Sequence, residues 1–252
     1  MPTIDRHDRL LSQLQANGRA SVSELAEGLG VTSATIRRDL HTLAGEGRLL
    51  RTYGGAALAD RRPVRDARTI DAKRAIAATA ARLVVDGSTI AIGSGTTTLE
   101  LARCLVDRRV TVITNALDVA NVLVDRAGVE LILLGGAVRP RMHSMLGHLA
   151  ELASTELRAE TLFMGIGAIS APHGLMNDSI PEIQTDRAIR RMARSVVVLA
   201  DATKFDAVAP AWVFGLDQVD TIVTDWTLAD DRLAEYERRG VRMSVAPEPG
   251  PR

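Results

Sequence analysis

Two adjacent arginines, Arg37 and Arg38, stand among small hydroxyl side chains between residues 32 and 42. A guanidinium group can fork onto atoms O6 and N7 of guanine or onto a phosphate, and a threonine can reach a phosphate or the methyl group of thymine. If the segment is helical, with about 100° of rotation per residue, Arg38 and His41 face away from its apolar stripe. Such a face has the chemistry needed to contact DNA in the major groove.

The helices that must position these arginines are predicted by capping residues and periodicity. Ser21 and Glu24 have the Ser-x-x-Glu spacing of a capping box, which predicts that a helix begins there. Gly30 stands where the left-handed residue that ends such a helix is wanted. Thr32 or Ser33 can cap a second helix. The inward-facing residues of this second helix are Ile36, Leu40 and Leu43. Two short helices joined this closely predict a helix-turn-helix.

A strand, a turn and a second strand are expected within residues 47–55, directly after the second helix. This pair of strands would form a wing that carries Arg48, Arg51 and Tyr53 along the phosphates. Asp39 is expected to face sideways and to orient an arginine. The predicted DNA contacts are Ser21, Thr32, Ser33, Thr35, Arg37, Arg38, His41, Arg48, Arg51 and Tyr53. The alternative is an ordinary helical hairpin with a solvated charged face.

From residue 71 onward, short apolar segments alternate with helical patterns. The expected strands are Thr89–Ile92, Val110–Ile113, Leu131–Leu134, Leu162–Met164, Val196–Ala200, Thr221–Val223 and Arg242–Val245. The expected helices contain Ile76–Leu83 and Leu99–Leu105 or lie around 117–125, 148–158, 182–194 and 230–238. Apolar strands that are separated by helices predict an α/β fold with a mostly parallel sheet, buried on both faces.

Glycine and hydroxyl residues follow the first of these strands. The segment Gly93-Ser94-Gly95-Thr96-Thr97-Thr98 opens the next helix. Its glycines permit close approach of the backbone, and its N–H and hydroxyl groups can bind an anion such as phosphate. The pattern is neither Gly-x-Gly-x-x-Gly nor a Walker motif, and the alternative is a simple capped turn with nothing bound.

Small or polar residues end other strands as well, where a parallel sheet binds its ligands. The further strand-end residues expected to line a ligand site are Asn115, Gly135, Gly136 and Gly165. Asp178 and Glu182 could accept hydrogen bonds from sugar hydroxyls, and Lys204 could neutralise a phosphate. The alternatives are a helix cap for Asp178, a partner of the helix dipole for Glu182 and an exposed cation for Lys204.

Length and composition favour two domains. A chain of 252 residues, 46% of them hydrophobic, can bury a substantial core. Pro63 and the lack of an apolar period predict a linker at 59–70, between domains at 1–58 and 71–246. The first 62 residues hold nine arginines against seven acids, and the whole chain is neutral. DNA binding would therefore depend on where the arginines stand, with little long-range steering by net charge.

Cysteine usage and hydropathy argue against other classes of protein. The single cysteine, Cys104, provides neither a disulfide framework nor a cysteine-rich zinc site, and we expect no metal and no cofactor. No apolar run approaches the roughly 20 residues of a membrane span. We expect a cytoplasmic protein without a membrane partner.

The motif Thr-Ile-Arg-Arg-Asp-Leu at 35–40, followed by Gly-x-Leu-x-Arg and Gly54-Gly55-Ala56, resembles the winged helix-turn-helix of the DeoR/GlpR family of bacterial transcriptional regulators. The similarity is continuous from about Arg6 to Ala57. It implies a repressor of carbohydrate-metabolism genes that binds double-stranded operator DNA. A homo-oligomer, either a dimer or a tetramer, would occupy repeated or inverted half-sites.

The second half of the chain resembles the effector-sensing domain of the same family. The segments that carry this similarity are Lys73-Arg-Ala-Ile-Ala, Gly95-Thr-Thr, Ile113-Thr-Asn, Leu134-Gly-Gly, Gly147, Phe163-Met-Gly and Leu199-Ala-Asp-Ala-Thr-Lys-Phe. That domain is related in fold to ribose-5-phosphate isomerase and glucosamine-6-phosphate deaminase. The resemblance therefore implies a phosphorylated sugar or sugar alcohol as effector. It assigns the phosphate loop to Ser94–Thr98 and the polyol contacts to Asn115, Asp178, Glu182 and Lys204.

This chain departs from the pattern of many family members at two positions near the expected site. Gly93 stands where many have an aspartate, and Asp186 stands where many have a lysine. Both changes alter the charge near the effector.

Two classes of function fit these features. In the preferred one, the protein is no enzyme, and an effector shifts the population between forms that bind and release DNA. In the alternative, the larger domain is a sugar-phosphate isomerase or deaminase with an appended DNA-binding domain. Catalysis would then need Asp178 or Glu182 as the base and His143 or His173 as the acid.

Overall fold

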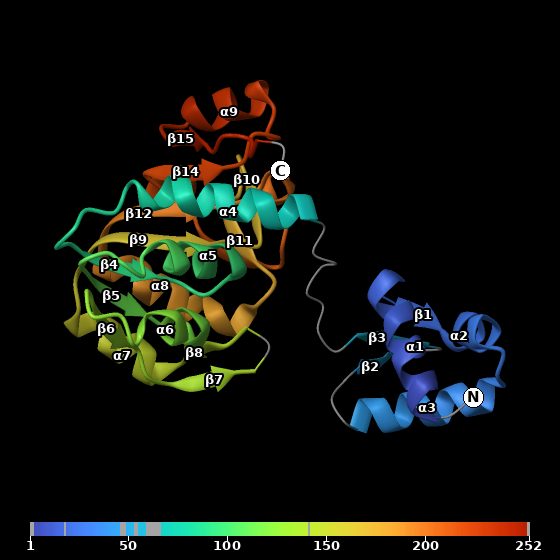
Figure 1. Ribbon diagram of the computed structural model, residues 1–252. Helices are drawn as coiled ribbons and strands as arrows, with labels where there is room; N and C mark the ends of the chain where they lie inside the picture. The colour runs from blue at the N-terminus through green and yellow to red at the C-terminus, as the bar shows by residue number, and fades with distance from the viewer. Residues whose placement is uncertain are drawn as a thin grey trace. The chain divides into compact units, whose positions relative to one another are not determined.

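A computed structural model of the chain, drawn in Figure 1, describes residues 3–17, 19–45, 49–52, 55–58, 67–140 and 142–250. The chain divides into an N-terminal unit, Met1–Asp66, and a C-terminal unit, Ala67–Arg252. The first helix of the C-terminal unit begins at Ala67. Residues 67–70, which we expected in the linker, are therefore helical, and residues 59–66 lie outside the described part of the chain.

The N-terminal unit combines helices with a small antiparallel sheet. Its elements are α1 (Thr3–Asn17), β1 (Arg19–Ser21), α2 (Val22–Leu29), α3 (Ser33–Gly45), β2 (Leu49–Thr52) and β3 (Gly55–Leu58). The strand order is β1-β3-β2. Leucines of α1 join the inward faces of α2 and α3 in one apolar core. The core is centred on Leu10, Leu14, Leu25, Ile36, Leu40 and Leu43.

The start and end of α2 are fixed by the residues that the sequence pattern indicated. The Oγ atom of Ser21 accepts a hydrogen bond of 3.2 Å from the N–H of Glu24, and the Glu24 carboxylate accepts one of 2.7 Å from the N–H of Ser21. Gly30 ends the helix with φ of 64°, a conformation that costs glycine nothing. The predicted capping box and helix end are confirmed. Helix α1 and strand β1 were not predicted.

Seven parallel strands form the main sheet of the C-terminal unit. The strands are β4 (Thr89–Ile92), β5 (Val110–Thr114), β6 (Val129–Leu133), β9 (Ala159–Gly165), β12 (Ala193–Leu199), β14 (Thr221–Thr224) and β15 (Arg242–Val245). Their order across the sheet is β15-β14-β12-β9-β4-β5-β6, and every neighbouring pair is parallel. Each of these strands overlaps a strand predicted from the sequence. The expected fold, a helix-turn-helix followed by a larger α/β unit with a parallel sheet, is confirmed.

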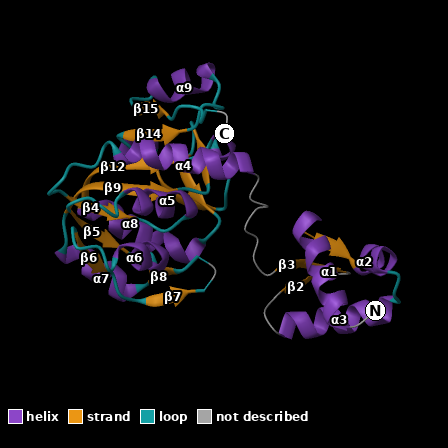
Figure 2. Cartoon of the chain, viewed as in Figure 1, coloured by secondary structure: helices purple, strands orange, loops and turns teal. Residues whose placement is uncertain are grey.

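Helices cover both faces of this sheet (Figure 2). Helices α4 (Ala67–Ala81), α5 (Thr96–Cys104) and α6 (Leu117–Leu123) pack into one apolar cluster on the first face. Helices α7 (His148–Glu156), α8 (Ile183–Met192) and α9 (Asp230–Glu237) belong to the cluster on the other face. This arrangement explains why the residues of β4 and β5 and the second halves of β9 and β12 are mostly apolar.

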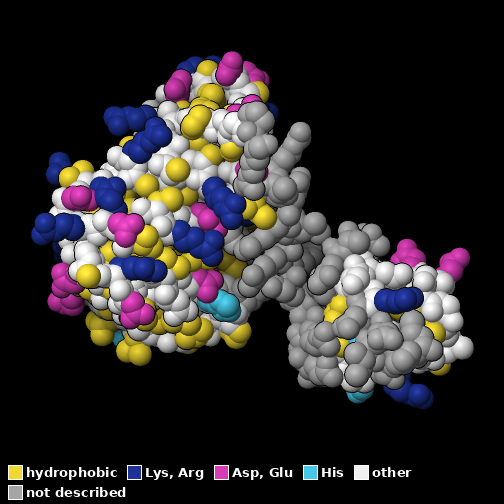
Figure 3. All heavy atoms as spheres, in the orientation of Figure 1, with side chains coloured by type: hydrophobic (Ala, Val, Ile, Leu, Met, Phe, Trp, Pro, Cys, Tyr) yellow, Lys and Arg dark blue, Asp and Glu magenta, His cyan; other side chains and the backbone are white. Residues whose placement is uncertain are grey.

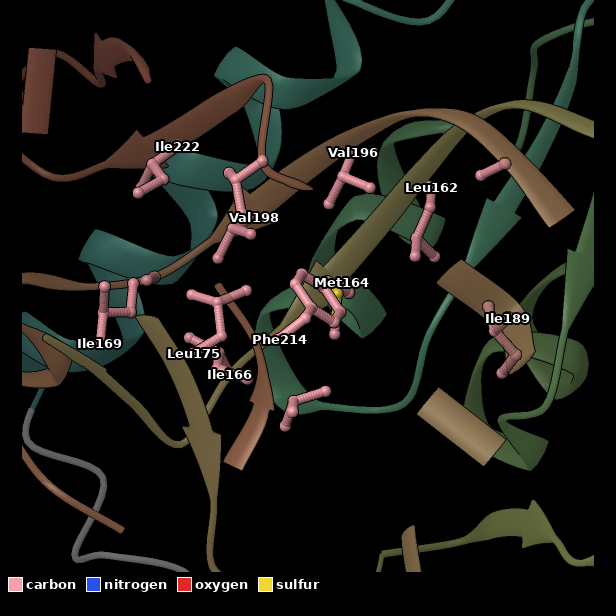
Figure 4. Packing of buried hydrophobic residues seen from close by; sticks show 14 of the residues in the cluster. Leu162, Met164, Ile166, Ile169, Leu175, Ile189, Val196, Val198, Phe214 and Ile222 are labelled. Atoms are coloured by element: carbon pink, nitrogen blue, oxygen red, sulfur yellow. The ribbon is translucent and has the colours of Figure 1, made fainter. Parts of the chain in front are cut away.

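Successive residues of the central strands alternate between the two clusters. On β9, Leu162 and Met164 lie in the cluster shown in Figure 4, whereas Phe163 belongs to the opposite one. On β12, Val196 and Val198 join the first of these clusters. Because of this alternation, each face of the sheet is covered by its own apolar core. The two cores hold the central strands, and the loops at their ends, in place.

Two smaller sheets complete the C-terminal unit, and neither was predicted. Strands β7 (Ala137–Arg139) and β8 (Ser144–Leu146) form an antiparallel pair between β6 and α7. Strands β10 (Ala168–Ser170), β11 (Gly174–Asn177) and β13 (Ala211–Phe214) form an antiparallel sheet that packs into the same cluster as α8. Short 3-10 helices lie at Ile180–Glu182, Ala202–Lys204 and Leu216–Gln218. Within the described residues, none of the helices has the length and apolarity to cross a membrane.

Candidate functional site

Helix α3 presents a polar face opposite its buried one. Ile36 and Leu40 are buried in the core of the N-terminal unit, whereas Arg37, Arg38 and His41 are exposed. The side chains of the two arginines therefore leave the core, Arg38 opposite the apolar stripe and Arg37 on its flank, as the helical spacing indicated. Within the N-terminal unit, this face carries the residues expected to contact DNA.

Thr32 caps α3. Its Oγ1 atom accepts a hydrogen bond of 3.3 Å from the N–H of Thr35 and lies 2.9 Å from the Thr35 hydroxyl. Ser21 likewise uses its hydroxyl oxygen as the cap of α2. Two of the hydroxyl groups expected on DNA thus already hold a helix end in place, and the Ser21 hydroxyl, which accepts in the cap, can still donate its proton to a phosphate.

Asp39 is buried, with 4% of its surface exposed, and does not face sideways as expected. The arginine that it orients is Arg6 of α1, whose Nε and Nη2 atoms donate hydrogen bonds of 2.6 and 2.9 Å to its two carboxylate oxygens. Atom Nε2 of His7 lies 3.2 Å from Oδ1. The Arg6 guanidinium lowers the pKa of the Asp39 carboxyl. Sequence reasoning missed Arg6 and His7, although an aspartate beside an apolar stripe requires a buried partner.

Only one of the three side chains expected on the wing belongs to a described residue. Arg48 and Tyr53 lie outside the described residues. Arg51 lies in β2, opposite Ala56 of β3. Strands β2 and β3 are antiparallel as predicted, but β3 begins at Gly55, where the predicted second strand ends.

In the C-terminal unit, the direction of the connections reverses between β4 and β9. From β4 the chain proceeds to β5 and β6 on one side, and from β9 it proceeds to β12, β14 and β15 on the other. Open parallel sheets bind ligands at such a reversal, beside the carboxyl ends of the strands. We call the adjacent carboxyl ends of β4 and β9 the switch point.

Two glycine segments meet at the switch point. The N–H of Gly93, after β4, donates a hydrogen bond of 2.9 Å to the carbonyl of Phe163 in β9. A Cβ atom at Gly165 would lie 3.7 Å from the carbonyl oxygen of Ser94. The predicted loop at 93–98 and Gly165 are thus neighbours, although the sequence did not reveal the strand order that joins them.

The three threonines of this loop differ in environment. Thr96, the first residue of α5, is exposed, while Thr97 and Thr98 are buried. The Thr98 hydroxyl donates a hydrogen bond of 3.0 Å to the carbonyl of Gly95, which has φ of 142°. Backbone N–H groups of the first helical turn have no partners within the helix and can bind an anion.

Asn115, which follows β5, is 3% exposed and has an acceptor without a partner. Its Nδ2 atom donates a hydrogen bond of 3.1 Å to the carbonyl of Met145, but its Oδ1 atom lacks a partner in the described structure. A buried polar atom without a partner is costly, so it indicates a missing donor such as a ligand hydroxyl or a water.

Of the two expected glycines at 135 and 136, only Gly136 has a structural explanation. A Cβ atom at Gly136 would lie 2.6 Å from the carbonyl oxygen of Leu146, and the residue has φ of 127°. Gly136 therefore permits the close pairing of β7 with β8. Gly135 has open space around it.

Glu182 is buried and forms a network with two residues that the sequence did not indicate. Its Oε1 atom lies 2.9 Å from Nη1 of Arg139 and accepts a hydrogen bond of 2.9 Å from Ser144. Ser144 also forms a bridge with Ala116, next to Asn115. The structure thus connects Glu182 to the end of β5 through strand β8.

Asp178 and Lys204 are not brought into this network. Asp178 is exposed, and Lys204 ends the 3-10 helix that follows β12. In the described part of the chain, neither side chain forms a hydrogen bond or an ion pair with the loop at 93–98 or with Glu182. Lys204 keeps its charge available near the carboxyl end of β12.

A second network runs from the end of β9 into α8. The Asn177 side chain accepts a hydrogen bond of 2.9 Å from the N–H of Gly167 and donates one of 3.0 Å to Asp186. Burial raises the pKa of Asp186 to about 7, with a further contribution from the negative charge of Glu182. Asp186 therefore gains a proton close to neutral pH. Among the described residues there is no cluster of His, Cys, Asp and Glu that could hold a metal ion.

Two family models match the chain over most of its length. Residues 6–62 match the DeoR-like helix-turn-helix domain, and residues 68–226 match the DeoR C terminal sensor domain. The chain is 33% identical to the HTH-type transcriptional repressor CsqR of Escherichia coli K12, over 87% of each chain. It is 32% identical to the glycerol-3-phosphate regulon repressor of the same strain, over 89% of this chain and 92% of the relative.

Among solved structures, ribose 5-phosphate isomerase A of Methanocaldococcus jannaschii matches 53% of each chain with a TM-score of 0.39 and 20% identity. The exposed arginine face on α3, the parallel sheet with its switch point and the two family matches agree with one another. The chain belongs to the DeoR family of transcriptional regulators, with a helix-turn-helix domain followed by a sensor domain.

Proposed function

We propose that the protein represses carbohydrate-metabolism genes and releases its operator when a phosphorylated sugar or sugar alcohol binds at the switch point. The observation that carries the proposal is the arginine face of α3. Arg38 is exposed on the side opposite Ile36 and Leu40, and Arg37 is exposed on the flank of that face, as a helix that enters the major groove requires. Several DeoR relatives are named repressors of sugar or polyol regulons, which supports the same class of target genes.

The effector site that we propose has a phosphate end and a hydroxyl end. The N–H groups at the start of α5 and the exposed Thr96 would bind the phosphate, with Lys204 as a counter-charge. The partnerless Oδ1 of Asn115 would accept a hydrogen bond from a sugar hydroxyl. An effector that binds one conformation better than another shifts the population between DNA-binding and released forms.

The arrangement of acidic residues supports a sensor rather than an enzyme. Glu182, one of the two bases that an isomerase or deaminase reaction would use, has its Oε1 atom engaged by Arg139 and Ser144 rather than free to contact a substrate. Atom Nδ1 of His143, a possible acid, lies 2.9 Å from Oδ1 of Asp118 in α6. We propose that the sensor domain binds its sugar phosphate without turnover, in a cytoplasmic protein.

We further propose that the protein acts as a homo-oligomer, a dimer or a tetramer, because repeated half-sites require more than one copy of α3. Hydrophobic side chains gather on the surface of the C-terminal unit over α7 and β7 (Figure 3). Leu149 and Leu152 of α7 are 63% and 52% exposed, and Val138 of β7 is 49% exposed. An exposed apolar area of this kind is typical of a surface that contacts another subunit.

One experiment tests the proposed function as a whole. The full-length protein is used to select duplexes from a random-sequence pool, and the selected duplex is titrated by band shift with a panel of sugar phosphates. Inorganic phosphate and the matching unphosphorylated sugars serve as controls. We expect one selected sequence class, with release by a sugar phosphate alone. Selection of no sequence class, or consumption of the sugar phosphate by the protein, would contradict the proposal.

A further inference from the structure

A buried carboxylate joins the first helix of the chain to the DNA-facing helix. Arg6 of α1 forks onto both oxygens of Asp39, and His7 approaches the same carboxylate from the next position along α1. The exposed fraction of the side chain is 5% for Asp39 and 13% for Arg6 and for His7. Asp39 directly follows Arg38 in α3. The partners come from a part of α1 that the proposed DNA face does not include.

We propose that Asp39 is a positioning residue for sequence recognition: Arg6 and His7 hold its carboxylate and thereby fix how α3 presents Arg37 and Arg38 to the base pairs. The proposal rests on the proposed function, which places these two arginines in the major groove. Asp39 itself does not touch DNA in this arrangement.

Apolar packing alone would leave the orientation of α3 loosely defined. The contacts of Ile36, Leu40 and Leu43 hold one face of the helix against the core, but such contacts have no preferred direction. A bidentate pair between a guanidinium and a carboxylate has a fixed planar geometry. It therefore opposes rotation and sliding of α3 against α1. Base readout depends on such precision, because groups held about 0.5 Å out of place lose much of their effect.

The pair also removes a charge conflict at the DNA surface. Asp39 is the one acidic residue between Ser33 and Gly45, on the helix that carries Arg37 and Arg38. An unpaired carboxylate there would repel the phosphates. The positive charge of Arg6 compensates it, and because this same partner lowers the pKa of Asp39, the carboxylate remains charged for the fork at neutral pH.

The test uses the full-length protein and the duplex that it selects from a random pool. Arg6→Lys keeps the positive charge but cannot fork, so we expect it to retain the melting temperature and to weaken binding of the selected duplex by about tenfold. Asp39→Asn should weaken binding at least as much, and the Arg6→Lys/Asp39→Asn double variant little more than either single variant. Binding of mixed-sequence DNA and the dependence of selected-duplex binding on salt should stay unchanged, because neither residue contacts a phosphate.

Three controls separate positioning from other roles. Glu27→Gln removes an exposed acid of α2 and should bind as the parent does. Ile36→Val lowers the stability of the same core without touching the carboxylate and should preserve affinity at temperatures where the protein is folded. Arg38→Ala tests the proposed DNA face independently.

Each outcome has a defined meaning. Parent affinity in Arg6→Lys would overturn the positioning role. An equal loss of affinity in folded Ile36→Val would overturn it as well. A smaller salt dependence in an Arg6→Gln variant would instead make Arg6 a phosphate contact, which also overturns it. If Arg38→Ala binds as the parent does, the proposed DNA face itself is wrong. If only Arg38→Ala weakens binding, the DNA face stands and the role of Asp39 fails.

Discussion

Asn177 donates a hydrogen bond of 3.0 Å to Oδ2 of Asp186 and so connects the last residue of β11 to the first turns of α8. The other side of the same amide accepts the N–H of Gly167, just beyond β9. One neutral side chain thus supports an acidic group and a backbone segment next to the switch point. The pKa of Asp186, raised to about 7 by burial and by the nearby Glu182, makes this contact sensitive to pH.

Asp186 should make the stability of the sensor domain fall as the pH rises. Its carboxyl ionises near pH 4 in the unfolded chain but near 7 in the folded one, so folding binds a proton between these values. The contribution is fully present below about pH 4 and is lost by about pH 7, at up to about 1.4 kcal/mol for each pH unit. In urea titrations from pH 5 to 8, Asp186→Asn should therefore gain stability relative to the parent as the pH rises. The exposed Asp178→Asn is the control, and an identical pH profile for Asp186→Asn and the parent would show that Asp186 ionises normally.

Replacing Arg37 or Arg38 with alanine should weaken binding of the selected duplex by about 1–3 kcal/mol. Each side chain is exposed on α3, and truncation removes a guanidinium from the face that enters the groove. Band-shift titration measures the change. Arg82→Ala removes an exposed arginine of the C-terminal unit and should leave affinity unchanged. An effect of Arg82→Ala equal to that of Arg38→Ala would mean that only the total charge matters.

Thr96→Glu should abolish release of DNA by the effector without weakening DNA binding. The exposed Thr96 is the first residue of α5, so a carboxylate there would occupy the proposed anion position and repel a phosphate. A glutamate in the first turn is favourable for a helix, so stability should not decrease. Glutamine has nearly the shape of glutamate but no charge. The Thr96→Gln variant should therefore still release DNA when the effector binds. A normal response in Thr96→Glu would place the phosphate elsewhere.

Ser21→Ala should destabilise the N-terminal unit by about 1 kcal/mol. The Ser21 hydroxyl oxygen accepts the N–H of Glu24, and alanine leaves this donor without its cap. Thermal melting followed by circular dichroism measures the loss. Ser23 stands two residues later, at an exposed site of α2. The Ser23→Ala variant should therefore have nearly the melting temperature of the parent. If Ser21→Ala melts at the same temperature as the parent, water must satisfy the Glu24 N–H as well as the Ser21 hydroxyl does.

The long elements of this fold could be predicted from the sequence because their patterns are local. Segments such as Thr89–Ile92 and Val196–Ala200 are short apolar runs between helical repeats, and the first is a parallel strand while the second overlaps one that ends at Leu199. Strand β10 was missed because it is three residues long and buried throughout, so that its sequence has no alternation to detect. Helix α1 was missed because its few leucines stand among polar residues.

The candidate sites could be predicted in part. The exposed face of α3 follows from helical rotation, and the loop at 93–98 follows from its composition. Neither the adjacency of Gly165 and Ser94 nor the pair between Arg6 and Asp39 could be predicted, because each joins segments far apart in the chain. The order of strands across a sheet and the contact of one helix with another are properties of tertiary packing, which single-residue patterns do not contain.

The space beside Gly165 has a consequence for how such regulators diversify. A methyl group at this position would sit at an ordinary contact distance from Ser94, so alanine fits there without displacing the backbone. In the effector site that we propose, an alanine at this position would narrow the space next to the ligand while α3 stays the same. Two proteins that differ by this one methyl group would then bind the same DNA sequence and discriminate between effectors of slightly different size.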